Sequence, residues 1–278
     1  MKNITNQDDV TVASFGDEWS RLNQSHLSED EKQRIFEDYF YLFPFDHIGS
    51  GAIGFDMGCG SGRWATLVAP RVAELYCIDA SPEAINVAKT NLQAFSNVSF
   101  KVASVNETGI PNGFFDFGYS LGVLHHLPDT AAAIKSCADM LKPGAPFLLY
   151  LYFAFDNKPV WYKALWRVSE LFRNVINRMS PSMKAISSNI FATFVYWPLA
   201  RMAKCLELLN LNIDSFPLAY YRDKSFYTMR TDARDRLGTP LEKRFTRDEI
   251  STMLLNAGFE NIVFSERRPY WVALTYKC

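Results

Sequence analysis

The sequence contains no long hydrophobic run and almost no net charge. Its longest apolar stretches, 146–155 and 190–200, are shorter than the ~18 uninterrupted apolar residues that a membrane-spanning helix needs. The formal net charge is −1, so the overall charge gives no indication of a nucleic-acid partner. Residues 1–12 are polar and lack the apolar segment of a secretory signal. We therefore expect a globular cytoplasmic protein that does not bind nucleic acid.

Cysteines and histidines are few and widely spaced. The five cysteines form an odd set without C-x-x-C spacing: Cys59, Cys77, Cys137, Cys205 and Cys278. Such a set is typical of reduced cytoplasmic thiols. The four histidines are His26, His47 and the adjacent pair His125 and His126. This scatter indicates no metal site. The sequence also lacks a G-x-S-x-G elbow and a P-loop, which argues against a serine hydrolase and a nucleotide triphosphatase.

Strand and helix patterns alternate between residues 51 and 155. Strands are predicted at 52–56, 74–79, 98–103, 115–120 and 146–152, and helices near 63–69, 82–94 and 129–140. This alternation is typical of a parallel sheet covered by helices on both faces.

The C-terminal part of the chain predicts a helix followed by a hairpin. Thr246 caps a helix that runs to Ala257, and strands follow at 262–265 and 271–276. Because the connection between these strands is short, they must be antiparallel.

A glycine turn follows the first predicted strand. Gly58, Gly60 and Gly62 come directly after Asp56, and a helical pattern begins at Trp64. Glycine lets bare backbone approach a ligand, and a helix N-terminus offers unpaired N–H groups to a negative charge. The next strand ends on Asp79, an acid placed to accept the hydroxyls of a ribose.

These motifs resemble the class I S-adenosylmethionine-dependent methyltransferases. Residues 56–62 read DMGCGSG, similar to the family's first motif, D-x-G-C-G-x-G. The similarity continues at 114–120, 121–127 and 141–145. The resemblance implies a doubly wound, Rossmann-like α/β fold with a seven-stranded sheet whose last strand is antiparallel. It also implies S-adenosyl-L-methionine as the cofactor, S-adenosyl-L-homocysteine as the product, no metal, and a small-molecule substrate.

The resemblance assigns roles to particular residues. The glycine turn would hold the methionine end of the cofactor, Asp56 its amino group, and Asp79 its ribose. Ser104 stands where the family usually carries an acid that meets the adenine amine, and its hydroxyl can still accept a hydrogen bond. The expected cofactor-binding residues are Phe15, Trp19, Asp56, Gly58, Cys59, Gly60, Gly62, Arg63, Asp79, Ala80, Ser104, Val105, Leu121 and His126.

Three parts of the chain are expected from these patterns. Residues 51–155 and 241–278 would form the cofactor-binding domain. Residues 1–50, with helical periodicity at 29–41, would form an N-terminal helical segment. Two roles suit Phe15 and Trp19 equally well in this segment. They can close over the cofactor as a lid, or they can pack the segment against the core as a plug. Residues 156–240 would be a helical cap that determines which acceptor substrate can enter.

Within 156–240 an amphipathic helix is predicted at 160–179 and a second, apolar helix at about 190–209, kinked or broken by Pro198. Residues 217–240 read as a loop rich in Tyr, Arg and Asp. Guanidinium groups suit a carboxylate or phosphate, and aromatic faces suit a cation. Salt bridges that anchor the cap are the alternative. The substrate candidates are Tyr220, Tyr221, Arg222, Tyr227 and Arg230.

Residues 157–205 carry one acid, Glu170, against eight basic residues: Lys158, Lys163, Arg167, Arg173, Arg178, Lys184, Arg201 and Lys204. The favoured interpretation is a solvated face whose apolar side contacts another domain or a second copy in a homodimer. Contact with an anionic membrane surface is the less favoured alternative.

The reaction expected is transfer of a methyl group to an O or N atom of a small molecule. His125, His126 and Tyr227 are the candidate catalytic residues, with histidine suited to act as a base near neutral pH. Histidines in this segment of the family commonly pack beside the cofactor without taking a proton. Alternatives are an enzyme that cyclises or cleaves the cofactor without an acceptor, and a non-catalytic cofactor-binding subunit. The glycine spacing and the terminal hairpin disfavour a nicotinamide dinucleotide.

Overall fold

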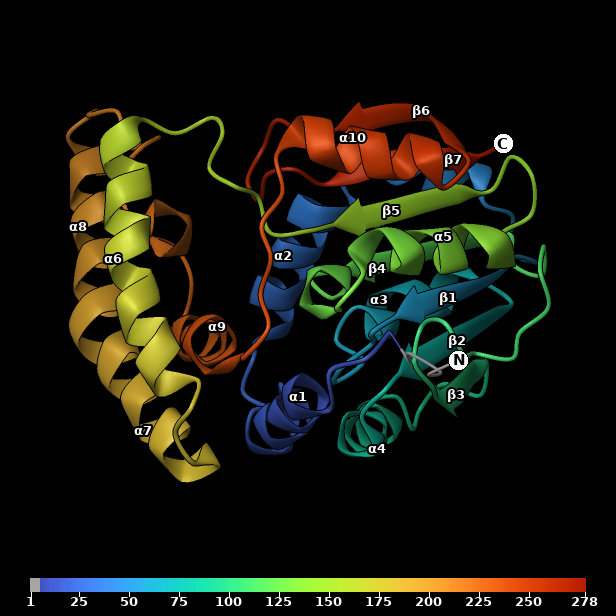
Figure 1. Ribbon diagram of the computed structural model, residues 1–278, viewed down its shortest axis with the longest axis horizontal. Helices are drawn as coiled ribbons and strands as arrows, with labels where there is room; N and C mark the ends of the chain where they lie inside the picture. The colour runs from blue at the N-terminus through green and yellow to red at the C-terminus, as the bar shows by residue number, and fades with distance from the viewer. Residues whose placement is uncertain (1–5) are drawn as a thin grey trace. The chain divides into compact units, whose positions relative to one another are not determined.

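The computed structural model describes residues 6–278, and these fall into two compact units (Figure 1). Unit 1 comprises Met1–Gln24, Lys32–Ala154 and Leu241–Cys278, and unit 2 comprises Ser25–Glu31 and Phe155–Pro240. The expected N-terminal segment 1–50 is thus shared, because residues 25–31 pack with unit 2. The expected cap 156–240 coincides with the main part of unit 2.

Unit 1 is built on a single mixed sheet. Its strands are β1 Ile53–Met57, β2 Glu74–Asp79, β3 Val98–Val102, β4 Phe117–Leu121, β5 Pro146–Tyr150, β6 Phe259–Phe264 and β7 Ala273–Lys277. The order is β3-β2-β1-β4-β5-β7-β6. Strands β1 to β5 pair in parallel, and β7 runs antiparallel to both β5 and β6. The predicted seven-stranded fold with an antiparallel last strand is confirmed.

The helices of the sheet domain begin where the sequence provides caps. They are α1 Asp9–Arg21, α2 Glu29–Phe40, α3 Ala65–Val68, α4 Pro82–Asn91, α5 Thr130–Met140 and α10 Arg247–Asn256. The side chains of Ser81 and Asp129 accept hydrogen bonds from the first turns of α4 and α5, and Thr246 forms a capping box with Glu249. Helix α1 was not predicted, since only 29–41 showed helical periodicity.

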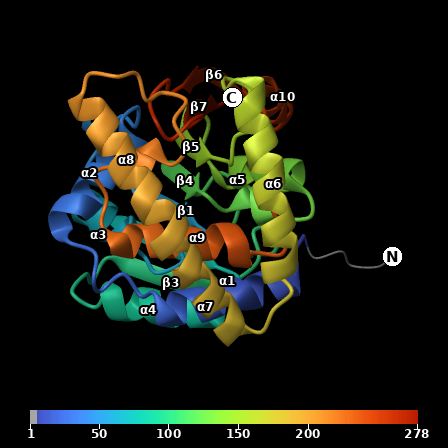
Figure 2. The same ribbon diagram turned by 90° about the vertical axis from the view of Figure 1, so that its left-hand side faces the viewer.

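Two hydrophobic cores cover the two faces of the sheet. On one face α5 and α10 pack over strand residues such as Phe55 and Phe147. On the other face α2, α3 and α4 pack over residues such as Leu75 and Tyr119. Successive strand residues point to opposite faces, so the near-continuous apolar strands bury side chains in both cores. Figure 2 shows the same elements from the side.

Unit 2 is helical. It contains α6 Val160–Ile176, α7 Pro181–Phe191, α8 Trp197–Leu208 and α9 Phe226–Gly238, with a π-helical segment at Ala192–Tyr196. The predicted helix at 160–179 is confirmed apart from its last turn. The second predicted helix begins earlier than expected, at Pro181. It is interrupted at the π-helical segment, directly before Pro198 in the first turn of α8.

The prediction of a loop over 217–240 is wrong, because α9 occupies most of it. Ser225 caps this helix by accepting a hydrogen bond from the Thr228 N–H. Met229, Ala233 and Leu237 follow at four-residue intervals and are buried. The many polar residues between them concealed this apolar row in the sequence.

No helix among residues 6–278 is long and apolar enough to cross a membrane.

Candidate cofactor-binding site

The glycine turn is tied to the end of the second strand by main-chain hydrogen bonds. The N–H groups of Gly58 and Cys59 both donate to the Ile78 carbonyl, at 2.7 and 3.1 Å. Gly58 and Gly60 have φ angles of +78° and +52°, a left-handed region that favours glycine. The turn therefore presents main chain without side chains at the carboxyl ends of β1 and β2, where ligands bind in open parallel sheets.

Asp79 closes this turn. Its Oδ2 accepts the Gly60 N–H at 2.9 Å and its Oδ1 accepts the Ser81 N–H at 2.9 Å. Burial raises the pKa of Asp79, while hydrogen bonds from the main chain of Ser81, Gly60 and Ala80 oppose the shift. A carboxylate has about four acceptor sites, so Asp79 keeps capacity for ribose hydroxyls beside the bonds from Gly60 and Ser81.

Asp56 is a buried acid whose Oδ2 has no hydrogen-bond partner among the described residues. Burial raises its pKa to about 8; the nearby charge of Asp79 adds to the shift, and the Tyr119 hydroxyl and Arg63 oppose it. Tyr119 lies opposite Asp56 in the β1–β4 pair. Burying a carboxyl oxygen without a hydrogen-bond partner costs free energy unless a ligand supplies that partner. A cationic ligand group would supply it.

Ser104 lies just beyond the end of β3, and its buried Oγ also has no partner within the described chain. The hydroxyl can donate to or accept from a ligand. Asp56 near the end of β1, Asp79 at the end of β2 and Ser104 just beyond β3 thus stand at the same edge of the sheet, on three adjacent strands.

Helix α1 brings two aromatic side chains to this edge. The Trp19 indole lies against the glycine turn, since a Cβ atom on Gly60 would approach it to 2.9 Å. The Phe15 ring lies edge-on to the His126 ring, with centroids 4.9 Å apart. The helix reaches this position because Gly16 packs closely against Ser81 and Glu83 at the start of α4. This geometry fits both a lid and a plug.

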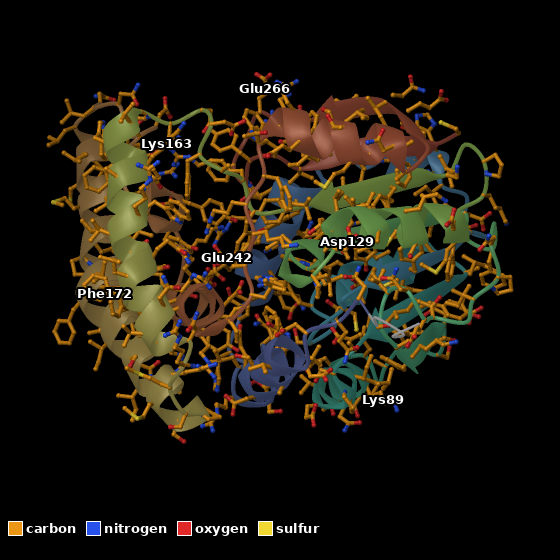
Figure 3. The ribbon with its side chains drawn as sticks, viewed as in Figure 1. Lys89, Asp129, Lys163, Phe172, Glu242 and Glu266 are labelled. Carbon is orange, nitrogen blue, oxygen red and sulfur yellow. The ribbon has the colours of Figure 1, made fainter. Side chains whose placement is uncertain are left out.

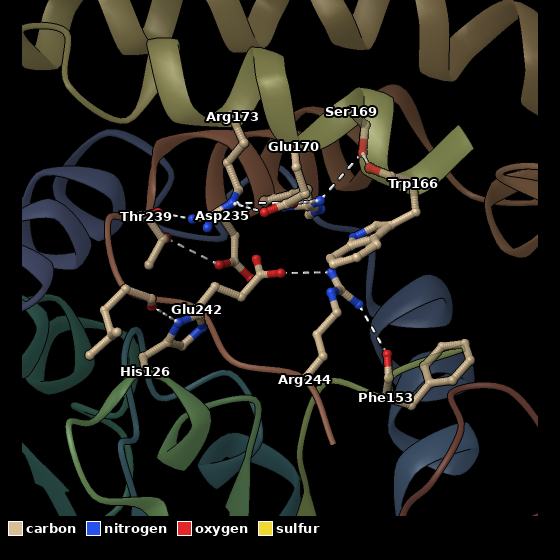
Figure 4. A network of polar contacts seen from close by, with 12 residues as sticks. His126, Phe153, Trp166, Ser169, Glu170, Arg173, Asp235, Thr239, Glu242 and Arg244 are labelled. Atoms are coloured by element: carbon tan, nitrogen blue, oxygen red, sulfur yellow. Dashed lines mark hydrogen bonds and ion pairs between the residues drawn. The ribbon is translucent and has the colours of Figure 1, made fainter. Parts of the chain in front are cut away.

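The two adjacent histidines differ in their surroundings. His125 is fully buried, and burial together with the charges of His126 and Arg244 lowers its pKa well below its usual value. His125 is therefore neutral, and its ring stacks near Tyr152. The His126 Nδ1 lies 2.7 Å from the Leu241 carbonyl, so Nδ1 carries the proton and the Nε2 lone pair is the acceptor (Figure 4).

Comparisons with known proteins agree with this geometry. Residues 55–149 match the family described as "Methyltransferase domain". Residues 55–149 thus form a methyltransferase domain, and the resemblance to the class I S-adenosylmethionine-dependent methyltransferases is confirmed.

Curated methyltransferases match only about a third of this chain. The ubiquinone biosynthesis O-methyltransferase of Xanthomonas campestris pv. campestris (strain B100) is 36% identical over 101 residues, which are 36% of this chain and 42% of that protein. The protein of the same name from Xanthomonas oryzae pv. oryzae (strain PXO99A) is 35% identical over 102 residues, with 36% and 43% covered. The chain therefore spans less than half the length of these relatives.

Two solved structures share the methyltransferase fold over nearly the whole chain. Magnesium protoporphyrin IX methyltransferase from Synechocystis PCC 6803, solved with bound SAH, has a TM-score of 0.57 at 14% identity, with 100% of both chains covered. The protein solved in complex with the Trm112 methyltransferase activator of Haloferax volcanii has a TM-score of 0.51 at 12% identity, covering 94% of this chain and 95% of that one.

The remaining expected cofactor residues also lie in unit 1. Cys59 and Val105 are buried, Ala80 follows β2, and Leu121 ends β4. The Arg63 guanidinium lies over the Trp64 ring at 4.0 Å. Their roles toward the methyltransferase cofactor stay predictions.

The expected substrate residues all lie in unit 2, where several have contacts of their own. Tyr221 lies near the Tyr196 ring, and burial raises its pKa well above its usual value. Arg222 pairs with Glu207 at 2.9 Å. Tyr220 packs against the Lys224 ammonium, and Arg230 lies over the Tyr227 ring. The contacts of Tyr221 and Arg222 favour a structural role for these two.

Four residues near the histidines had no assigned role before the structure. Tyr119 lies beside Asp56, and Tyr152 packs on His125. Arg244 pairs with Glu242 at 2.8 Å (Figure 4). It also lies over the Tyr152 ring. Only Tyr119 carried a signal in the sequence, because it stands on the strand expected beside Asp56. The others are brought together by the return of the chain at 241–245.

Substitution of Gly60 by alanine should distort the glycine turn and displace the Trp19 indole that packs on it. The new methyl group would meet Trp19 at 2.9 Å on a backbone with φ +52°, so we expect roughly tenfold weaker cofactor binding and altered tryptophan fluorescence. Gly113→Ala is the matched control, since Gly113 also has a positive φ, +65°, but has open space around its Cβ position. Equal behaviour of the two variants in calorimetric titration would contradict the role assigned to Trp19.

Proposed function

We propose that this protein transfers a methyl group from S-adenosyl-L-methionine to an O or N atom of a small molecule. The observation that carries the proposal is the edge formed by Asp56, the glycine turn and Asp79, in which a buried carboxyl oxygen has no partner within the described chain. The O-methyltransferase relatives favour an oxygen acceptor. Less than half of each relative is matched, so they do not identify the acceptor.

The residues present fit this cofactor. Asp79 would accept the ribose hydroxyls with its remaining lone pairs, and Asp56 would accept the amino group of the methionine end. Ser104 would meet the adenine. Glycine is required at Gly58 and Gly60, because a Cβ atom on either residue would collide with Val123 or Trp19 and distort the turn that would hold the methionine end. No cluster of His, Cys, Asp or Glu in residues 6–278 has the arrangement of a metal site.

Bound S-adenosyl-L-methionine would supply an electrophilic methyl group. The protein's task is then to align the acceptor atom with that group and to keep water out. Phe15 and Trp19 are placed to shield the turn, with α1 as the proposed lid. Unit 2, with Tyr220, Tyr227 and Arg230, is the proposed source of substrate contacts. We also propose that the protein acts in the cytoplasm.

His126 is the proposed base when the acceptor must lose a proton. Its Nδ1 proton is held by the Leu241 carbonyl, so Nε2 presents the lone pair that can accept a proton. His125 is less suited, because its buried ring resists the charge that proton transfer would create.

Replacement of His126 by glutamine should lower kcat about a hundredfold without changing the affinity for S-adenosyl-L-homocysteine. His47→Gln is the control, since His47 is exposed. An unchanged kcat in the His126 variant would show that His126 is not the base.

The experiment that tests the proposed function uses cofactor labelled at the transferred methyl group. Purified protein is incubated with it in the presence and absence of fractionated small-molecule extract. Label that moves to an extract component, together with formation of S-adenosyl-L-homocysteine, supports the proposal. Consumption of cofactor without any acceptor would show cyclisation or cleavage instead, and no turnover with tight binding would show a non-catalytic subunit.

A further inference from the structure

Helix α6 of unit 2 presents an apolar surface to solvent. Five of its side chains recur every three or four residues and therefore form one row along the helix. They are between 48% and 60% exposed: Trp161, Leu165, Val168, Phe172 and Val175. Leu171 stands beside this row and is 66% exposed. We call these six side chains the outer face of α6. Figure 3 shows Phe172 projecting from the helix on this side.

The opposite side of α6 holds the helix in its unit. Arg173 and Ile176 are buried, and the Arg173 Nη1 donates to the Thr239 carbonyl at 2.8 Å, just after the end of α9. The only acid of α6, Glu170, pairs with Arg173 and with Arg236 (Figure 4). The outer face is therefore an additional apolar surface, separate from the face that packs in unit 2.

The apolar surface continues onto the next helix. The rings of Phe172 and Phe191 lie edge to face with centroids 5.6 Å apart, which joins α6 to α7. Met183, Ile186 and Ile190 on α7 are each more than half exposed. An exposed apolar surface that extends over two helices is typical of an interaction site.

Most basic residues of 157–205 are occupied within unit 2. Arg173 and Lys184 bind carbonyl groups at the end of α9, at Thr239 and Gly238. Arg201 binds the carbonyls of Arg222 and Lys224, Lys204 pairs with Glu207 and Asp223, and Lys158 donates to Asp214. These five cations are structural.

Of the other three cations, Arg167 and Arg178 lie beside the outer face. Arg167 stands one turn before Leu171, and Arg178 follows the end of the helix, three residues after Val175. Lys163 stands on the far side of the helix from the apolar row. Within residues 6–278 none of the three has an ion pair or a side-chain hydrogen bond. Free positive charge thus borders the apolar row, with no acid among the outer-face residues to balance it.

We propose that the outer face of α6 binds the surface of an anionic lipid bilayer. The apolar row would enter the boundary between headgroups and acyl chains, and Arg167 and Arg178 would meet lipid phosphates. Trp161, at one end of the row, is a residue type favoured at this boundary. The helix would lie in the plane of the surface, since no described helix is long and apolar enough to span a membrane.

The charges favour a lipid surface over a second copy of this chain. In a symmetric dimer the same patch faces itself. Arg167 and Arg178 of each copy would then be brought toward those of the other, and the outer face provides no acid to pair with them. An anionic surface instead complements both the apolar row and its charged border.

The test is co-sedimentation of the full chain with vesicles of phosphatidylcholine alone and of phosphatidylcholine mixed with phosphatidylglycerol in equal parts. We expect binding to the mixed vesicles, weakened by added salt, and little binding to the neutral ones. Arg167→Gln with Arg178→Gln should weaken binding roughly 30-fold at low ionic strength. Lys89→Gln with Lys101→Gln, which removes the same charge from unit 1, should leave it unchanged.

A second pair of variants tests the apolar row. Leu171→Ser with Val175→Ser should abolish binding at moderate salt, whereas Val10→Ser with Leu255→Ser, exposed apolar positions in unit 1, should not. Titration with S-adenosyl-L-homocysteine verifies that unit 1 of each variant is folded. Absence of vesicle binding, equal binding to neutral vesicles, or no effect of the α6 variants would overturn the proposal. A solution dimer that the Leu171 and Val175 changes convert to monomer would also overturn it.

Discussion

Replacing Asp79 with alanine should weaken binding of S-adenosyl-L-homocysteine by about a hundredfold. Each hydrogen bond from a ribose hydroxyl to a carboxylate contributes about 1.5–3 kcal/mol, and the proposal assigns two of them to Asp79. The same carboxylate also accepts the Gly60 and Ser81 N–H groups, so its loss would loosen the turn as well. Isothermal titration calorimetry of the purified variant gives the affinity directly.

A control must separate lost recognition from lost stability. Asp129→Ala removes another aspartate of unit 1 that accepts a main-chain N–H, at the start of α5. It should lower the free energy of unfolding by about 1 kcal/mol and leave affinity for S-adenosyl-L-homocysteine unchanged. Asp79→Asn, which keeps one acceptor oxygen, should fall between Asp79→Ala and the unmodified protein. If Asp79→Ala binds as tightly as Asp129→Ala, the assigned ribose contact is wrong.

The second large effect is a dependence of cofactor affinity on pH. Burial raises the pKa of Asp56 from an ordinary value of 3.8 to about 8, so the free protein holds this carboxyl protonated at neutral pH. Binding of a cationic amino group requires the carboxylate. Affinity for S-adenosyl-L-homocysteine should therefore rise about tenfold per pH unit as pH increases toward 8 and level off above it.

Calorimetry in two buffers of different ionisation enthalpy measures the proton linked to this binding. We expect release of close to one proton per cofactor at neutral pH, and none in Asp56→Asn, whose weaker affinity should be nearly independent of pH. Proton release that persists unchanged in Asp56→Asn would assign the effect to another group.

The free energy of unfolding of the ligand-free protein should also depend on the ionisation of Asp56. Between the ordinary pKa of 3.8 and the raised value of about 8, the folded protein binds a proton at Asp56 that the unfolded chain does not. The free energy of unfolding should thus decrease as pH rises through this window. Asp56→Asn should show a shallower decrease in thermal denaturation measured across the same pH range.

The sheet and the cofactor edge could be predicted because their signals are local. Asp56, the three glycines and Asp79 stand at the ends of successive strands, and the alternation of strands and helices restricts how those strands can be arranged. The short connection before the last strand determined its antiparallel direction. The chemistry of the edge follows from the same residues, since their positions in the chain place them at one end of the sheet.

The helices outside the sheet were predicted less well. Helix α1 has a largely polar sequence, and its place depends on Gly16 fitting against α4, a contact between residues far apart in the chain. Helix α9 was taken for a loop because Tyr, Arg and Asp separate its buried positions. In both cases packing against other elements, rather than local preference, stabilises the helix.

The sequence by itself determined the fold of unit 1, the family and the identity of the cofactor-binding edge, because each is encoded by residues close together along the chain. Only the tertiary structure decided which of the basic residues in 157–205 are free, since five of them find carbonyl groups or acids on other segments of unit 2. It also decided that the Asp56 carboxyl group is buried beside Tyr119. Burial and pairing depend on distant segments meeting in space, and a linear pattern does not contain that information.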